Sequence, residues 1–469
     1  MSSEAGRVLG LLFGAVFAIS CSDPKPSAAE TTNARRADPP AVSASAASSS
    51  AVAGSDGELG ALRADQRGMA VQIRTPTAPS KADGASLEKE IKTALPDVPL
   101  GGAGAPSGRL ELHAAGELPE IPAMYYERLD PLLQSAVRTR SGIFFGAALD
   151  QDKGLKRLRA FEAVVLQMVK KHGGAIWDES MHAVLTPEAW EGLRVASWEG
   201  DLCDAATHMR IRQYAASPDR FRAITYGLSV MGLPELVIDD VPPPHSDQAA
   251  LLIEAAAQTM VEGAELTATG QLDIDLAAIK HTASKKGLFE ESTKPGRLVI
   301  KLKPAKKEAD DPEGRVYAFD FSAFPGATPG EQLGSALTTL FGPVSDEPVM
   351  RSDDDKELTE AAKRVQAKVP ELAARAKKGI PPGEVLLIKA PFDTDDDSVE
   401  WMWVDVTSWD KGTARGHLAN RPTKIKGLMA GAKVEVPQAK IADYLWKKSD
   451  GTSEGGESIE ILKDRKRGQ

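Results

Sequence analysis

The apolar residues are distributed so that the chain falls into three stretches. A short apolar run covers Val8 to Ser20. From Ser22 to about Ser107 the residues are mainly Ala, Ser, Pro, Thr and Gly, and no aromatic residue occurs between Cys21 and Tyr125. From about Arg109 onward, apolar residues recur with the spacings that are typical of strands and helices. The pattern predicts a signal or anchor segment, a disordered stalk and a folded remainder.

The first half of the folded remainder mixes strands and helices. Residues 142–149 predict a buried strand, and apolar residues at helical spacing predict a helix over 152–171 that ends at Gly173. Helices are also expected after Thr186 and at 249–262 and 330–341. Further strands are expected at 175–178, 209–214, 297–302 and 315–321. No Gly-rich nucleotide loop opens any of these helices, which favours an α+β arrangement over a Rossmann domain.

The last part of the chain begins with a charged helix over residues 353–378. Strands are predicted at 385–392, 399–405 and 431–436, with an acidic hairpin loop at 393–397. We therefore expect a signal peptide (1–20), a stalk that starts at the lipidated Cys21 (21–108), an α+β domain (109–345) and a second α+β domain (353–469). A short helix at 85–95 is the one element expected inside the stalk, because its other residues cannot bury enough apolar surface to offset their ordering entropy.

The N-terminal run is too short to span a bilayer, which takes about 20 apolar residues, but it has the length of a signal-peptide core. The residues Ala18-Ile19-Ser20-Cys21 resemble a bacterial lipobox, although Ala18 stands where Leu is usual. The resemblance implies cleavage before Cys21, acylation of its thiol and, because Ser22 follows, attachment to the outer membrane. A plain secretory signal and an uncleaved anchor are the alternatives.

The sequence contains 2 cysteines, Cys21 and Cys203. If Cys21 carries lipid, Cys203 has no partner for an intramolecular disulfide. We expect Cys203 to be a buried small hydrophobic residue rather than a nucleophile.

The last quarter of the chain contains a series of residues at defined spacings, which is a more specific signal of family membership than amino-acid composition. Lys389 and Phe392, then Glu400, Trp403 and Val404, then a Gly-x-Leu-x-Asn-x-Pro turn from Gly416 to Pro422 follow in order. Gly431, Val434, Ile441 and Asp443 complete the set. This order resembles the YegJ-like family, a bacterial domain of unknown function, and the resemblance implies no activity.

Candidate ligand-binding residues lie within this region: Trp401, Trp403, His417, Asn420 and Arg421. Trp401 and Trp403 share one face of a strand. A core face is the favoured interpretation, and a ligand platform is the alternative. His417 is expected at the surface of the Gly-x-Leu turn. Asn420 and Arg421 are expected to have turn-forming roles, unless they converge with Trp403 on one pocket for an anionic or amide ligand.

No catalytic or metal-binding signature is present in the sequence. The His-Glu-x-x-His pattern and the Walker loop are absent, and the histidines are not at ligand spacing. A net charge of −10 argues against nucleic acid as a partner. We expect no cofactor.

These observations favour a lipoprotein of the bacterial cell envelope that acts as a non-enzymatic binding or scaffolding module. The expected partners are the membrane, through the lipid, and an envelope protein. An envelope hydrolase with its site in residues 109–345 and an immunity or toxin-associated protein are the alternatives.

Overall fold

The computed structural model describes most of the chain from residue 67 onward. The described residues are 62, 67–101, 108–126, 129–149, 155–217, 220–308, 311–342, 356–381, 384–395, 398–419, 422, 424–425, 427–428, 432–448 and 453–467. The predicted signal peptide and lipidated Cys21 lie outside these residues. Mixed helices and mainly antiparallel sheets confirm the α+β class.

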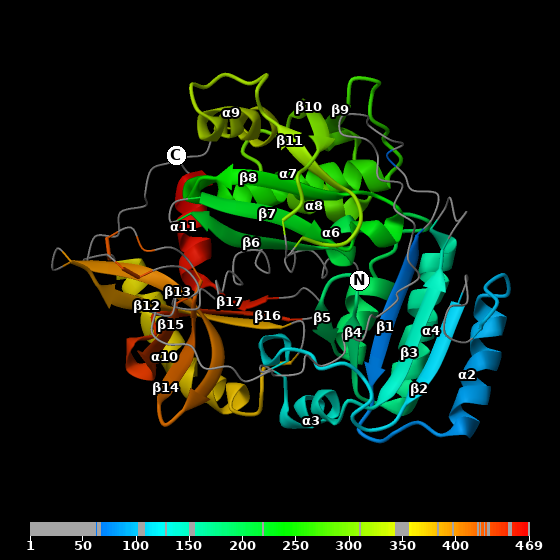
Figure 1. Ribbon diagram of the computed structural model, residues 1–469. Helices are drawn as coiled ribbons and strands as arrows, with labels where there is room; N and C mark the ends of the chain where they lie inside the picture. The colour runs from blue at the N-terminus through cyan, green and yellow to red at the C-terminus, as the bar shows by residue number, and fades with distance from the viewer. Residues whose placement is uncertain are drawn as a thin grey trace, which may run out of the picture.

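The first sheet has five antiparallel strands in the order β2-β3-β1-β4-β5 (Figure 1). Its strands are β1 (Gly68–Arg74), β2 (Gly108–His113), β3 (Gly142–Ala148), β4 (Ala175–Asp178) and β5 (Ala183–Leu185). Its helices are α2 (Lys81–Ala94), α3 (Pro131–Thr139) and α4 (Lys156–His172), with a short 3-10 turn η1 (Ala123–Tyr125). If η1 and α3, which lie between β2 and β3, are set aside, the order β1-α2-β2-β3-α4-β4 is the split β-α-β arrangement of ferredoxin-like folds.

The stalk predicted for residues 21–108 is wrong from Gly68 onward. β1 pairs with β3 on one side and with β4 on the other, so it is a central strand of the first sheet. Its residues Met69, Val71 and Ile73 point into the core at every second position. So short a run of alternating residues is difficult to recognise in a sequence next to a segment rich in Ala, Ser and Pro. The short helix expected at 85–95 is confirmed as part of α2, whose N-terminus is closed by a Ser80–Asp83 capping box.

The second sheet has six strands in the order β6-β7-β8-β11-β10-β9, with β8 and β11 parallel. Its strands are β6 (Arg210–Ser217), β7 (Arg220–Tyr226), β8 (Glu235–Val241), β9 (Gln271–Asp275), β10 (Arg297–Pro304) and β11 (Val316–Asp320). The helices packed with it are α7 (Ser246–Val261), α8 (Thr282–Glu290) and α9 (Pro329–Phe341).

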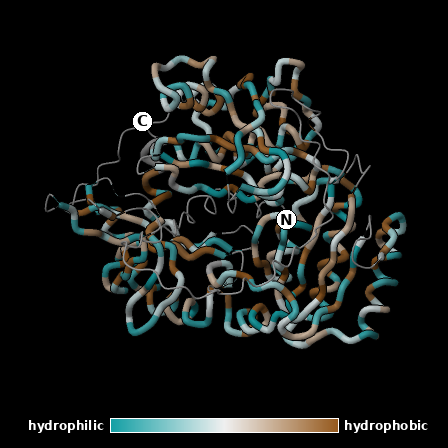
Figure 2. The backbone as a smooth tube through the Cα atoms, viewed as in Figure 1, coloured by the Kyte–Doolittle hydropathy of each residue, from teal (hydrophilic) through white to brown (hydrophobic). Residues whose placement is uncertain are grey.

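Short helical segments link the first two sheets: α5 (Pro187–Trp190), the π-helix η2 (Glu191–Val195) and α6 (Ala205–His208). Three 3-10 turns connect elements of the second sheet: η3 (Leu228–Met231), η4 (Pro243–His245) and η5 (Leu276–Ala278). One hydrophobic core runs from the helices of the first sheet to those of the second. Figure 2 shows hydrophobic residues along the strands and on the helices that pack against them. The first two sheets therefore share a core.

The third sheet has six strands in the order β15-β14-β13-β12-β16-β17 and a core of its own. Its strands are β12 (Val385–Asp393), β13 (Val399–Asp410), β14 (Thr413–Leu418), β15 (Lys433–Pro437), β16 (Asp443–Lys447) and β17 (Ser453–Gly455). It is accompanied by α10 (Lys356–Ala376), η6 (Gln438–Lys440) and α11 (Glu457–Arg467). Apolar residues of α10 such as Val365 and Leu372 pack on one face of this sheet.

Candidate functional site

The third sheet has two chemically different faces. Met402 and Val404 of β13 and Ile388 of β12 point to the face that α10 covers and belong to the core. Because side chains alternate along a strand, Trp401 and Trp403 point to the opposite face. The expectation that the two Trp rings form a core face is therefore wrong, since both are half-buried and lie outside the core cluster.

Lys389 of β12 is at the centre of this opposite face. In the strand register it lies across from Trp403 on one side and from Asp443 on the other. Its Nζ lies 5.6 Å from the centre of the Trp403 ring, a distance suited to a cation–π contact. The same Nζ lies 3.5 Å from Ser458 Oγ of α11. Three strands and the C-terminal helix thus meet at one lysine.

Asp443 holds the C-terminal helix onto this face. Its side chain accepts a hydrogen bond of 2.8 Å from the backbone N–H of Ser458 and another of 2.8 Å from the backbone N–H of Tyr444. Asp443 is buried, so these two donors compensate for the cost of removing a carboxylate from water. The first turn of α11 is therefore fixed beside Lys389.

Trp401 extends the same face toward the end of the hairpin. It lies across from Pro391 in the register, and both side chains are half-buried. We call the surface formed by Lys389, Pro391, Trp401, Trp403 and Asp443 the tryptophan face. It combines two aromatic rings, a proline ring and a lysine in neighbouring positions.

His417 is the candidate whose predicted position is wrong. It lies in strand β14 rather than in a turn, and it is only 4% exposed. Its cross-strand neighbour is Asp405 of β13, which is fully buried on the same face. Gly416, just before it, has no room for a side chain, because a Cβ there would lie 2.0 Å from the carbonyl oxygen of Asp405. Residues 416–418, expected in a turn, are therefore the end of strand β14, which packs closely against β13.

The other predicted site residues lie outside the described residues. These are Asn420 and Arg421, together with the lipidation candidate Cys21. Sequence reasoning placed Lys389 and Asp443 in a motif but did not treat them as site residues. The signal that could have found Lys389 is its period-two spacing from Pro391, which resembles that of Trp401 and Trp403 on the partner strand.

A second polar cluster is buried in the core of the first two sheets. Glu162 of α4 lies at its centre, with its Oε1 2.9 Å from Nε2 of His208. Its Oε2 accepts a 2.9 Å hydrogen bond from Trp198 Nε1. The other ring nitrogen of His208 lies 2.9 Å from both the Asp204 carbonyl oxygen and Thr207 Oγ1. Glu162 and His208 have no exposed surface, so this cluster fits a structural role rather than that of a hydrolase site.

Cys203 lies close to this cluster and is fully buried. Burial raises the pKa of its thiol well above the ordinary value, and the carboxylates of Glu162 and Asp204 act in the same direction. A thiol held in its protonated form is a poor nucleophile. The expectation that Cys203 is a buried hydrophobic residue is confirmed.

Within the part of the chain that the structure describes, no three or more His, Cys, Asp or Glu side chains are grouped so that they could hold a metal ion. Among the same residues, no helix has both the length and the apolar character that a membrane span requires.

The last part of the chain is thus an α+β domain built on one antiparallel sheet with a half-buried tryptophan face. Residues 355–468 match the model of a family, DUF2314, which is described as an uncharacterized protein conserved in bacteria. This match confirms that the C-terminal region is a bacterial domain of unknown function. No curated protein and no solved structure matches the chain.

Proposed function

We propose that the chain is an envelope-anchored lipoprotein whose C-terminal domain binds a partner through the tryptophan face. One observation carries the binding part of the proposal. Lys389, Trp403 and Asp443 come from three strands, yet the strand register brings them side by side, with half-buried Lys389 and Trp403 next to the buried Asp443. A sheet face that only completes a core needs apolar side chains, whereas this face keeps a lysine beside aromatic rings.

The chemistry of the tryptophan face suits a protein partner with an apolar anchor. Trp is enriched at the energetic centres of protein interfaces, since it buries a large apolar area and loses little side-chain entropy. Lys389 adds a positive charge that can orient an acidic group of the partner. The expected partner is therefore an envelope protein that presents an apolar residue next to a carboxylate.

A capture experiment from bacterial membrane extract tests the binding part. The full chain would be compared with a Trp401→Ala/Trp403→Ala double variant and with Ser408→Ala, an exposed control on the same strand. We expect the captured partner to fall at least about 10-fold in the double variant, because hot-spot aromatic residues contribute roughly 2 kcal/mol or more each. Equal capture by all three proteins would contradict the proposal.

Mass spectrometry of the mature N-terminus tests the anchor. The proposal expects the mature protein to begin at an acylated Cys21, which supports stable membrane attachment when several acyl chains are present. A mature protein that begins at an unmodified residue, or that keeps Val8 to Ser20, would contradict it. This result is independent of the binding experiment.

A further inference from the structure

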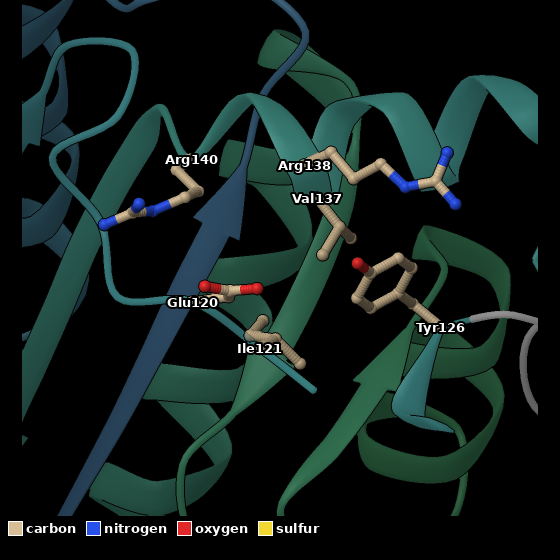
Figure 3. A pocket seen from close by; sticks show the side chains of 6 residues that line it. All are labelled: Glu120, Ile121, Tyr126, Val137, Arg138 and Arg140. Carbon is tan, nitrogen blue, oxygen red and sulfur yellow. The ribbon is translucent and has the colours of Figure 1, made fainter. Parts of the chain in front are cut away.

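A pocket separate from the tryptophan face lies between the loop that follows β2 and the C-terminal end of α3 (Figure 3). Its volume is about 250 Å³. It is lined by Glu120, Ile121, Tyr126, Val137, Arg138 and Arg140. Pockets for drug-sized ligands range from about 300 to 1,000 Å³, so this one suits a smaller molecule.

Two arginines, Arg138 and Arg140, line this pocket, and a third, Arg74, contacts the loop beside it. Arg138 donates a 2.8 Å hydrogen bond to Gln134 Oε1, and Arg140 donates one of 2.6 Å from Nε to the Leu118 carbonyl oxygen. Arg74, on β1 behind the loop, donates a 2.7 Å bond to the carbonyl oxygen of Pro119. Within the described part of the chain, none of the three lies within ion-pair distance of a carboxylate, although the protein carries a net charge of −10.

Arg74 shows that this positive charge is poorly compensated. Its side chain is fully buried, and Nε and Nη1 have no hydrogen-bond partner among the described residues. Burial lowers the pKa of Arg74 to about 10, and the charge of Arg140 acts in the same direction, while Glu179 partly opposes both. Arg140, which lines the pocket, therefore adds to a positive charge that no ion pair among the described residues offsets.

The pocket also contains one carboxylate and an apolar wall. Figure 3 shows the Glu120 carboxylate between the two arginines, with Arg140 on one side and Arg138 on the other. Ile121, Val137 and the ring of Tyr126 lie together on the Arg138 side. A purely anionic ligand would be repelled by Glu120, whereas a purely cationic one would be repelled by the arginines.

We infer that this pocket binds a small zwitterion with an apolar side chain, which is the chemistry of a free hydrophobic amino acid. Its ammonium group pairs with Glu120, and its carboxylate pairs with Arg138, which lies on the same side as the apolar wall. Its side chain packs on Ile121, Val137 and the Tyr126 ring. The site lies outside the region that matches the bacterial family, and it does not depend on the proposed function of the tryptophan face.

Calorimetric titration of the full chain with three related molecules tests this inference. L-leucine carries both charges, N-acetyl-L-leucine lacks the ammonium, and L-leucinamide lacks the carboxylate. We expect L-leucine to bind at least about 10-fold more tightly than either analogue, because each loses one charge-assisted interaction. Absence of L-leucine binding at concentrations up to tens of millimolar, or equal binding of all three, would overturn the inference.

Two variants locate the binding in this pocket. Glu120→Gln should remove the preference for L-leucine over its N-acetyl form, and Arg138→Gln should remove the preference over the amide. Both side chains are exposed, so neither change should unfold the protein. Glu88→Gln on α2 and Arg157→Gln on α4 are matched controls at other surface positions, and they should leave binding unchanged. L-leucine binding that Glu120→Gln and Arg138→Gln both leave intact would also overturn the inference.

Discussion

The buried cluster around Glu162 and the tryptophan face use similar residue types in opposite settings. Glu162 and His208 are sealed in the core of the first two sheets, next to indole and backbone groups. Lys389 lies on a sheet face beside two half-buried tryptophans. The first cluster has no exposed surface, whereas Lys389, Trp401 and Trp403 are half-buried and keep part of their surface exposed. Exposure, rather than the presence of His, Glu or Lys, separates the structural cluster from the candidate site.

The largest effect on stability is expected when the buried cluster around Glu162 is disrupted. Glu162→Ala leaves His208 and the Trp198 indole N–H without the carboxylate that they contact in the core. We expect a loss of about 3–5 kcal/mol in the free energy of unfolding, as for other buried pairs that lose one partner. Urea denaturation measures it, and Glu88→Ala on the exposed face of α2 should change stability by less than about 0.5 kcal/mol. A similar small effect for Glu162→Ala would mean that the cluster does not support the core.

Two tryptophans on β13 test the distinction between a buried structural residue and a half-buried residue of the candidate site. Trp409 is buried in the core of the third sheet, whereas Trp403 is half-buried on the tryptophan face. Trp409→Ala should cost about 3–5 kcal/mol because it leaves a large cavity. Trp403→Ala should cost clearly less, on the order of 1 kcal/mol, since the Trp403 side chain is already partly solvated. Equal losses in denaturation experiments would show that Trp403 is a core residue and would remove the basis of the binding proposal.

A smaller effect is expected from the close approach of β13 and β14. Gly416→Ala would place a methyl group 2.0 Å from the Asp405 carbonyl oxygen, so the strands must move apart. We expect a loss of about 1–3 kcal/mol, the usual cost of overpacking. Hydrogen exchange should show faster exchange in β13 and β14 and unchanged exchange in β1 and β3. Unchanged exchange in β13 and β14 would mean that the pair adapts without cost.

The smallest expected effect is a change in pH dependence. His182 is half-buried with a φ of 50° and stacks on Trp177. Burial, and next the charge of Arg212, lower the pKa of His182 below its ordinary 6.5. The fold therefore favours the neutral form of His182. The contribution of this residue to the free energy of unfolding is fully present above about pH 6.5 and is lost as the pH falls through the lowered pKa of the folded protein.

His182→Asn should make that loss shallower between pH 7 and 5 without disturbing the backbone, because Asn tolerates the left-handed region. Melting temperatures of the two proteins across this range provide the measurement. Parallel curves would show that His182 does not contribute to the acid sensitivity.

Much of the secondary structure could be predicted from local pattern. The helix capped by Thr186, the helix ending at Gly173 and the strands around residues 297–302 and 385–392 follow from capping chemistry and periodicity. β1 was missed because a seven-residue strand carries little signal inside an Ala/Ser/Pro-rich segment. What makes it a strand is pairing with β3 and β4, which begin more than 70 residues later along the chain.

The candidate site was only partly predictable for the same reason. Trp401 and Trp403 could be placed on one face from alternation alone. The position of Lys389 between Trp403 and Asp443 depends on the register of three strands, and the burial of His417 depends on a glycine contact across two strands. The register between strands that are distant in the sequence cannot be derived from local spacing. The site residues could therefore be listed from the sequence, but their positions relative to one another could not be predicted.

The position of β1 also determines how the fold would carry mechanical load. If the chain is tethered through its N-terminal end, a pull reaches the folded part at Leu62 and Arg67, just ahead of β1. β1 has hydrogen-bonded neighbours on both sides, so such a force would have to shear two ladders at once rather than peel a strand from an edge. An anchor joined to a central strand would hold the first sheet intact while drag acts on the rest of the molecule.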